Sequence, residues 1–253
     1  MRYVRFRHPL HGTATWGRAE DNGVQPLSAA PWRTDVVDVG TSLPREGLTL
    51  LAPAEPTKIV CIGQNYRKHA EEMGKVIPPE PLIFLKPPSA LNGPGFPIRL
   101  PPESAEVHHE AELGLVIGQR LTRADEKTAA AAIFGVTCFN DVTARDIQRR
   151  EVQHTRGKGY DTFACAGPEL VTQVDYADLA VRCRVNDEVR QDGRTSDMEF
   201  SPARLVAFIS SIMTLEPGDL VSTGTPSGVG KIVGGDVVEV EIESVGVLRN
   251  PVV

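Results

Sequence analysis

The stretch from Val107 to Gly118 places charged residues directly before an apolar, β-branched run that ends at glycine. This pattern predicts a strand. Because side chains two apart on a strand point to the same face, Glu110 and Glu112 should lie side by side at the mouth of an apolar segment. Two carboxylates placed there repel each other and lose hydration. A divalent cation with oxygen ligands is the simplest partner for them, and solvent or an arginine is the alternative.

Composition excludes several classes of protein. The 253 residues are 41% hydrophobic, which is enough for a packed core. The net charge of −6 comes without a basic stripe, so we expect no nucleic-acid partner. The N-terminus lacks the apolar core of a signal peptide, and no run approaches the roughly 20 apolar residues of a membrane helix. We therefore expect a cytoplasmic protein that does not enter membranes.

The cysteines argue against a thiolate zinc site. They are widely spaced, with no C-x-x-C pair, and most stand in apolar runs. We expect them to be reduced core residues. The four are Cys61, Cys138, Cys165 and Cys183.

The chain is expected to divide near a proline-spaced connector at residues 52–57. Residues 2–6 alternate in polarity, and breaks with glycine, asparagine and proline follow at short intervals. This predicts a small β-rich N-terminal domain over residues 1–54. Residues 55–253 would form the larger domain that carries the chemistry. Its C-terminal half contains two alternating strand patterns, residues 179–185 and 237–243. Between them, Ser201 followed by Pro202 predicts the start of a helix that reaches about Met213.

A second candidate for chemistry lies just after a short apolar strand at residues 58–63. The segment that follows predicts a short helix ending at Gly74. His69 and Glu72 are three residues apart, so a helix places them on one face. A carboxylate beside an imidazole fixes its tautomer and raises its basicity, as a general base requires. An ordinary surface pair would have the same spacing.

Asp141 follows a strand predicted over residues 133–139 and is the third carboxylate. Functional side chains often project from strand ends, although Asp141 could instead cap a helix through Gln148. Together with Glu110 and Glu112 it would give an oxygen-only ligand set. Such a set suits Mg²⁺, Mn²⁺ or Ca²⁺ rather than zinc or copper.

Three irregular segments are candidates for contact with a substrate. Residues 149–160 are basic and contain glycines, and could bring Lys158 over an anion. The Gly/Thr/Ser loop that begins at Gly224 and Thr225 offers backbone N–H and hydroxyl donors for a carboxylate. Residues 78–102 are rich in proline and glycine, as functional loops often are. A solvated loop or a structural turn remains the alternative for each.

In order and spacing, these motifs resemble the fumarylacetoacetate hydrolase family over about residues 58–253. The N-terminal segment resembles the small domain of bacterial members similar to 2-hydroxyhepta-2,4-diene-1,7-dioate isomerase. The resemblance implies a mixed, β-rich α+β fold, a β-roll of packed sheets with few short helices, in a homodimer. The motifs that carry it are Gly63–Tyr66 with His69 and Glu72, Phe84–Pro87, His109–Leu113, Asn140–Asp146, Lys158 with Asp161–Phe163, and Thr223–Pro226 with Gly228–Gly230.

The resemblance also implies roles for individual residues. Mg²⁺ or Mn²⁺ would be bound by Glu110, Glu112 and Asp141, and would be chelated by a 2-oxo or 2,4-diketo acid. His69 and Glu72 would activate water, and Lys158 would stabilise developing negative charge. Residues near the substrate would be Arg145, Gln148 and Thr225.

Three functions are compatible with these residues. The first is a metal-dependent hydrolase that cleaves a C–C bond of an acylpyruvate or fumarylpyruvate through an enolate. The second is an isomerase or decarboxylase of aromatic-acid breakdown, which would use the same site. The third is a non-catalytic module that binds a carboxylate, which would need no base beside its cation.

Overall fold

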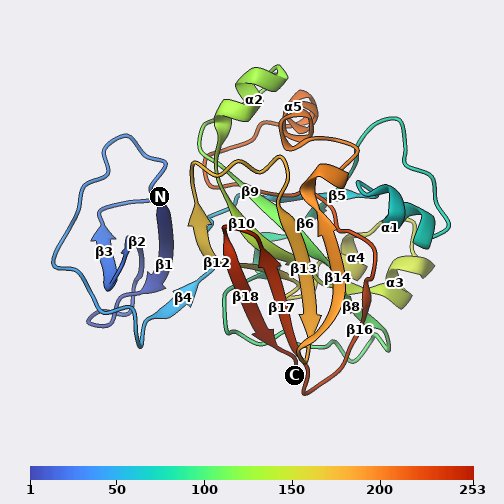
Figure 1. Cartoon of the computed structure of the whole chain (residues 1–253), viewed down its shortest axis with the longest axis horizontal. Helices are drawn as coiled ribbons and strands as arrows, with labels where there is room; N and C mark the ends of the chain where they lie inside the picture. Colours follow the sequence, from blue (N-terminus) through green and yellow to red (C-terminus); the bar gives the residue numbers. More distant parts are fainter.

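The computed structural model describes residues 1–253, and it is built mainly from strands, with short helices at the periphery (Figure 1). The expectation of a β-rich α+β fold is confirmed. The strands are β1 Arg2–Arg7, β2 Ala14–Glu20, β3 Gly23–Leu27, β4 Thr49–Leu51, β5 Ile59–Gly63, β6 Leu82–Lys86, β7 Leu91–Asn92, β8 Val107–His109, β9 Ala111–Ile117, β10 Ile133–Asp141, β11 Thr143–Ala144, β12 Ala164–Val171, β13 Ala180–Val185, β14 Glu188–Arg194, β15 Leu220–Ser222, β16 Gly230–Ile232, β17 Val237–Ile242 and β18 Gly246–Pro251. The helices are α1 Arg67–Glu72, α2 Glu126–Ala132, α3 Arg145–Arg150, α4 Thr155–Lys158 and α5 Pro202–Ile212, with 3-10 turns η1 Pro88–Ala90 and η2 Thr195–Asp197.

The largest sheet has 11 strands, and β9 lies near its centre between β10 and β15. Every residue of β9 is buried, because both faces of the sheet are covered here. Leu113, Leu115 and Ile117 join the main hydrophobic core, whereas Val116 packs into a second cluster on the other face. Glu112 has the same parity as Val116, so its side chain leaves the strand away from the main core.

A four-stranded sheet in the order β14–β13–β17–β18 covers the other side of that core. Its strands lie in front of β9, β10 and β12 in Figure 1. β17 alternates as the sequence predicts, with Val238, Val240 and Ile242 buried. The two sheets therefore close over one apolar core.

The N-terminal strands do not form a sheet of their own. β1 pairs with β2 and β4 but also with β12, so the large sheet continues into the N-terminal segment. The side chains of Arg2 and Arg45 both pair with the buried Glu169 of β12. A small separate core of Val4, Phe6 and Val24 lies among these strands. A domain boundary after residue 54 remains a prediction.

One local expectation is wrong, and one alternative is excluded. The predicted strand over residues 107–118 is broken at Glu110: β8 belongs to a three-stranded sheet with β11 and β16, and β9 to the large sheet. Asp141 does not cap a helix, since α3 begins after Ala144. Both differences have one cause, because the chain passes from one sheet to another at the site.

Helix α5 begins where the sequence predicts. Ser201 accepts a hydrogen bond from the backbone N–H of Arg204, and Pro202 is the first helical residue. Leu205, Val206 and Ile209 are buried, whereas Ile212 in the last turn is 54% exposed. No helix of the structure has the length and apolarity needed to cross a membrane.

Candidate active site

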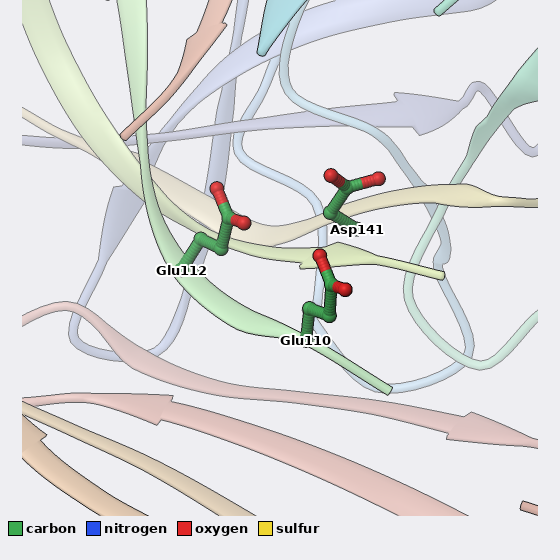
Figure 2. Close-up of side chains that lie close together, drawn as sticks. All are labelled: Glu110, Glu112 and Asp141. Carbon is green, nitrogen blue, oxygen red and sulfur yellow. The ribbon is translucent and has the colours of Figure 1, made fainter. Parts of the chain in front are cut away.

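The three predicted carboxylates meet on one face of adjacent strands (Figure 2). The backbone N–H of Asp141, at the end of β10, donates to the carbonyl of Glu110, and Glu112 lies opposite Phe139 of β10. All three side chains are buried, and one carboxylate oxygen from each lies within 4.8 Å of the others. The break after β8 turns the side chain of Glu110 towards Glu112 and Asp141, while β9 continues into the core.

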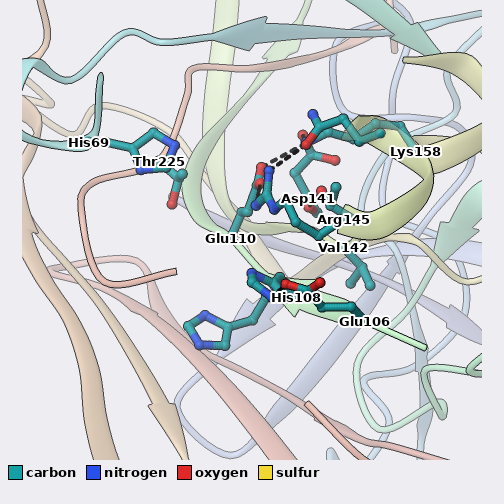
Figure 3. A network of polar contacts seen from close by, with 12 residues as sticks. His69, Glu106, His108, Glu110, Asp141, Val142, Arg145, Lys158 and Thr225 are labelled. Carbon is teal, nitrogen blue, oxygen red and sulfur yellow. Dashed lines mark hydrogen bonds and ion pairs between the residues drawn. The ribbon is translucent and has the colours of Figure 1, made fainter. Parts of the chain in front are cut away.

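Three buried cations contact this cluster, and two of them, Arg145 and Lys158, are seen beside Glu110 and Asp141 in Figure 3. The ammonium of Lys158 donates to Glu110 Oε2 and to Asp141 Oδ2, each over 2.7 Å. Lys86 donates to Asp141 Oδ1 and to the carbonyl of Val142. The guanidinium of Arg145 pairs with Glu110 Oε1. Glu110 therefore has an arginine partner, which was the alternative to a metal ion for the two glutamates. Lys158 is only 2% exposed, so it does not lie on a solvated loop.

The surroundings push two of these carboxyl pKa values in opposite directions. Burial favours the protonated form of Glu110, but the charges of Lys158 and Arg145 outweigh burial and lower its pKa. Burial, followed by the charges of Asp141 and Glu110, raises the pKa of Glu112 well above its usual range. Glu112 is therefore the carboxylate for which the structure provides the least positive charge.

The donor set fits a hard divalent cation. It consists of three carboxylates and no thiolate or imidazole, which suits Mg²⁺, Mn²⁺ or Ca²⁺. Both hydrogen bonds to Glu112, from Ser222 and from the backbone of Gly224, fall on Oε2, so its Oε1 is left for a ligand. An ion bound there would place positive charge beside Glu112, which has no cationic partner of its own. The identity of the metal stays a prediction.

His69 and Glu72 form a pair at the other side of the pocket. Nδ1 of His69 lies 3.2 Å from Glu72 Oε2 on helix α1. The ionised Glu72 can only accept, so Nδ1 carries the hydrogen and Nε2 is free to take a proton. The backbone N–H of Gly228 also donates to Glu72, over 3.1 Å. The alternative of an ordinary surface pair does not hold for His69, because its side chain lies in the pocket wall and is only 7% exposed.

One narrow pocket collects most of the predicted site. Its free space is about 50 Å³, enough for an ion and a few water molecules. Glu72, Asp141 and Gly224 stand just behind its wall and contact residues that form it. The predicted site residues that line it are His69, Glu110, Glu112, Arg145, Gln148, Lys158 and Thr225. The structure thus brings the predicted residues together, while their roles remain predictions.

The loop after β15 is used differently from the sequence-based expectation. The N–H of Gly224 donates to Glu112 rather than pointing to free solvent. The hydroxyl of Thr225 donates to the carbonyl of Ala111 and accepts from Gln191. These two groups are therefore not free to donate to a substrate carboxylate, and the loop supports the carboxylate cluster instead.

Other residues at the site were not assigned a role from the sequence. Lys86 follows an apolar strand and precedes two prolines, so nothing in its neighbours indicates a buried ion pair. His154 lines the pocket, with its ring edge-on to Phe84 and Nδ1 buried without a partner. Gln191 lies on a strand of exposed residues. Only long-range pairing in the fold reveals these three.

Size alone does not identify the site. A larger cleft, of about 980 Å³, lies between the N-terminal segment and the turn at Glu216 and Pro217. Its charged lining residues Arg33, Asp35 and Glu55 are exposed. Buried, closely spaced titratable groups distinguish the smaller pocket.

Comparison with known proteins identifies the family. The family model described as fumarylacetoacetate (FAA) hydrolase C-terminal matches residues 58–253, and a model described as Rv2993c-like, N-terminal, matches residues 1–53. Protein Rv2993c of Mycobacterium tuberculosis is 49% identical over 240 residues, covering 94% of this chain and 90% of that protein. A Xenopus laevis protein named mitochondrial oxaloacetate tautomerase fahd2 is 44% identical over 224 residues. The match covers 83% of this chain and 71% of the Xenopus protein.

The fold is also similar to solved structures over its whole length. The crystal structure of 5-carboxymethyl-2-hydroxymuconate delta-isomerase from Mycobacterium smegmatis superposes with a TM-score of 0.93 at 41% identity. It covers 100% of this chain and 99% of the other.

Proposed function

Because the chain belongs to the fumarylacetoacetate hydrolase family, we propose that it is a divalent-metal-dependent enzyme that isomerises a 2-oxo acid between its keto and enol forms. The observation that carries this proposal is the position of His69 in the same pocket as the carboxylate cluster. A base facing a site for a Lewis acid is the minimum that removal of a proton beside a ketone requires. Relatives named as a tautomerase and an isomerase support the same reaction class.

The charges of the pocket favour an anionic substrate. When all are ionised, the three carboxylates are balanced by Lys86, Lys158 and Arg145. A divalent cation adds two positive charges in a buried place, and such charges need compensation. A dianion, such as a 2-oxo acid with a second carboxylate or one in its enolate form, supplies it. The substrate class follows from this balance.

Each residue has a definable task in the reaction. A bound divalent cation would polarise the 2-oxo group of the substrate as a Lewis acid. His69 Nε2 takes a proton from the carbon beside that group, while Glu72 holds the ring and stabilises the imidazolium. The cationic groups of Lys158 and Arg145 favour the negative charge that develops on oxygen. The proton then returns to the oxygen or to a more distant carbon, which completes the isomerisation.

Hydrolysis of a 2,4-diketo acid is the second candidate. The His69–Glu72 pair favours it, because the same base could activate water for attack on a distal carbonyl. Hydrolysis additionally needs room for the water and for the acyl group. Leu82 and Phe84 give the pocket an apolar wall against which such a group could lie.

A small panel of substrates separates the candidates. Oxaloacetate is mixed with the protein and Mg²⁺, and the ultraviolet absorbance of its enol form is followed; acetylpyruvate and fumarylpyruvate are assayed for release of pyruvate. Isomerisation predicts faster keto–enol equilibration that stops with EDTA, without pyruvate from the diketo acids. Pyruvate from a diketo acid would establish the hydrolase instead, and no turnover of any compound would contradict both.

A further inference from the structure

Gln191 is the one buried residue on an otherwise exposed strand. Its neighbours on β14, from Glu188 to Arg190 and Asp192, are exposed, whereas Gln191 is 1% exposed. The pairing with β13 shifts at this point: Gln191 lies opposite Cys183 but Val189 lies opposite Arg184, so Arg190 is an extra residue. A β-bulge of this kind redirects the next side chain. Here it turns Gln191 inward.

The amide of Gln191 makes every hydrogen bond available to it. Its Oε1 accepts from the backbone N–H of Ala111 over 2.9 Å and from His109 Nδ1 over 3.0 Å. Its Nε2 donates to Thr225 Oγ1 over 2.7 Å and to the carbonyl of Pro226 over 2.8 Å. An amide has two lone pairs on oxygen and two hydrogens on nitrogen, so none is left for a ligand. Gln191 therefore acts on other protein groups.

These bonds close a ring around Ala111. The N–H of Ala111 donates to Gln191, Gln191 donates to Thr225, and the hydroxyl of Thr225 donates back to the carbonyl of Ala111 over 2.8 Å. Ala111 is the residue between Glu110 and Glu112. Both of its backbone polar groups are thus held by side chains, at the point where the chain leaves one sheet for another.

The hairpin that carries Gln191 is itself held tightly against the loop after β15. A Cβ on Gly193 would lie 2.6 Å from Pro226, and one on Gly228 would lie 2.0 Å from the carbonyl oxygen of Arg190. Both contacts require glycine, so the two backbones approach as closely as they can. Gln191 is consequently supported by a closely packed neighbouring loop.

We infer that Gln191 is a positioning residue, which fixes the separation of Glu110 and Glu112 by bracing Ala111 and so prepares the metal site. This inference rests on the proposed function, because it assigns these carboxylates to a divalent cation. Residues that orient metal ligands from behind typically change metal affinity by about 10- to 100-fold when they are lost.

The test measures the dissociation constant of Mn²⁺ by calorimetry, together with the thermal midpoint in EDTA. Gln191→Met keeps the volume and loses all four hydrogen bonds, so we expect Mn²⁺ affinity to fall about 10-fold or more. Val189→Ala, an exposed change on the same strand, is the control and should bind Mn²⁺ like the wild type. A lower thermal midpoint with unchanged Mn²⁺ affinity would overturn the inference, because it would show a structural role only.

A second pair of variants keeps the test decisive if Gln191→Met does not fold. Thr225→Val opens the ring at another edge, and Thr225→Ser retains the hydroxyl that closes it. We expect weaker Mn²⁺ binding in the first and wild-type binding in the second, whereas equal binding by both would overturn the inference. Absence of Mn²⁺ binding by the wild-type protein would instead overturn the proposed function, and this inference with it.

Discussion

The backbone N–H of Gly224 donates a hydrogen bond to Glu112 Oε2 over 2.8 Å. The hydroxyl of Ser222 donates to the same oxygen. Both donors are neutral, whereas Glu110 and Asp141 are paired with buried ammonium or guanidinium groups. Glu112 is thus held in place without a cationic partner, and it is the carboxylate at which a bound cation gains most.

Replacement of Glu112 by glutamine should separate metal binding from stability. Glu112→Gln removes a proposed metal ligand. Loss of a residue that only orients a ligand lowers metal affinity by up to roughly 100-fold, so loss of the ligand itself should lower Mn²⁺ affinity by more than that. In EDTA the variant should unfold at the same temperature as the wild type or higher, since burial already disfavours the anion. Calorimetry and thermal melts check both. A variant that binds Mn²⁺ normally would remove Glu112 from the ligand set.

Loss of Lys86 should make the protein depend on metal for stability. Lys86→Met leaves the buried Asp141 with one cationic partner fewer, and removing one partner of a buried pair costs about 3 kcal/mol or more. Mn²⁺ should restore part of that loss, because it places positive charge beside the same carboxylate. Denaturant titrations with Mn²⁺ and with EDTA measure the difference.

Lys58→Met is the matched control for that experiment. Lys58 pairs with the buried Asp219, which is not among the clustered carboxylates. The control should be destabilised equally with Mn²⁺ and with EDTA. If Mn²⁺ rescued both variants to the same degree, the effect on Lys86→Met would not come from the site.

The His69–Glu72 pair should matter for turnover but not for metal binding. His69→Gln removes the base, and general-base catalysis contributes about 100-fold or more. Turnover should fall by at least that factor while Mn²⁺ affinity stays within a few-fold of the wild type. Glu71→Gln, an exposed change on the same helix, should leave turnover unaltered. Full activity in His69→Gln would exclude this histidine as the base.

The stability of the protein in EDTA should fall in mild acid, and His154 should cause part of this fall. Burial, and then the charge of Lys158, lowers the pKa of His154 below its usual 6.5. As the pH drops, His154 therefore binds a proton in the unfolded chain before it does so in the folded protein. The free energy of unfolding decreases below about pH 6.5, and it stops decreasing once the folded protein is protonated as well. His154→Gln should make this dependence less steep between pH 7 and pH 5, and the exposed His11→Gln should not. Part of the slope should remain in His154→Gln, because burial also lowers the pKa values of His108 and His109. Identical slopes in all three proteins would contradict the assignment.

The fold could be predicted where local signals act within one element. Ser201 and Pro202 specify the start of α5 through a side-chain cap and a fixed φ, and alternation specifies β17. The break at Glu110 could not be predicted, because an unbroken strand and two strands in different sheets have the same local pattern. The pairing of β1 with β12 could not be predicted either, since it joins residues far apart in the chain.

The candidate site divides in the same way. Glu110, Glu112 and Asp141 can be predicted because the sequence places carboxylates at strand ends, where a buried charge requires an explanation. Lys86 and Gln191 cannot be predicted, because their partners are 55 and 80 residues away. For Thr225 and Gly224 the sequence indicated hydrogen-bond donors but not their acceptors, which turned out to be protein groups.

Exchange of the C3 hydrogens of a 2-oxo acid with deuterated solvent tests the proposed chemistry most directly, because conversion of the keto form to the enol begins by removing that proton. Oxaloacetate, 2-oxobutanoate and acetylpyruvate would be followed by NMR with Mg²⁺ and the protein. We predict exchange of at least one acid well above the rate with Mg²⁺ alone, abolished by EDTA and about 100-fold slower in His69→Gln. Exchange of all three at the rate of Mg²⁺ alone would contradict the proposal.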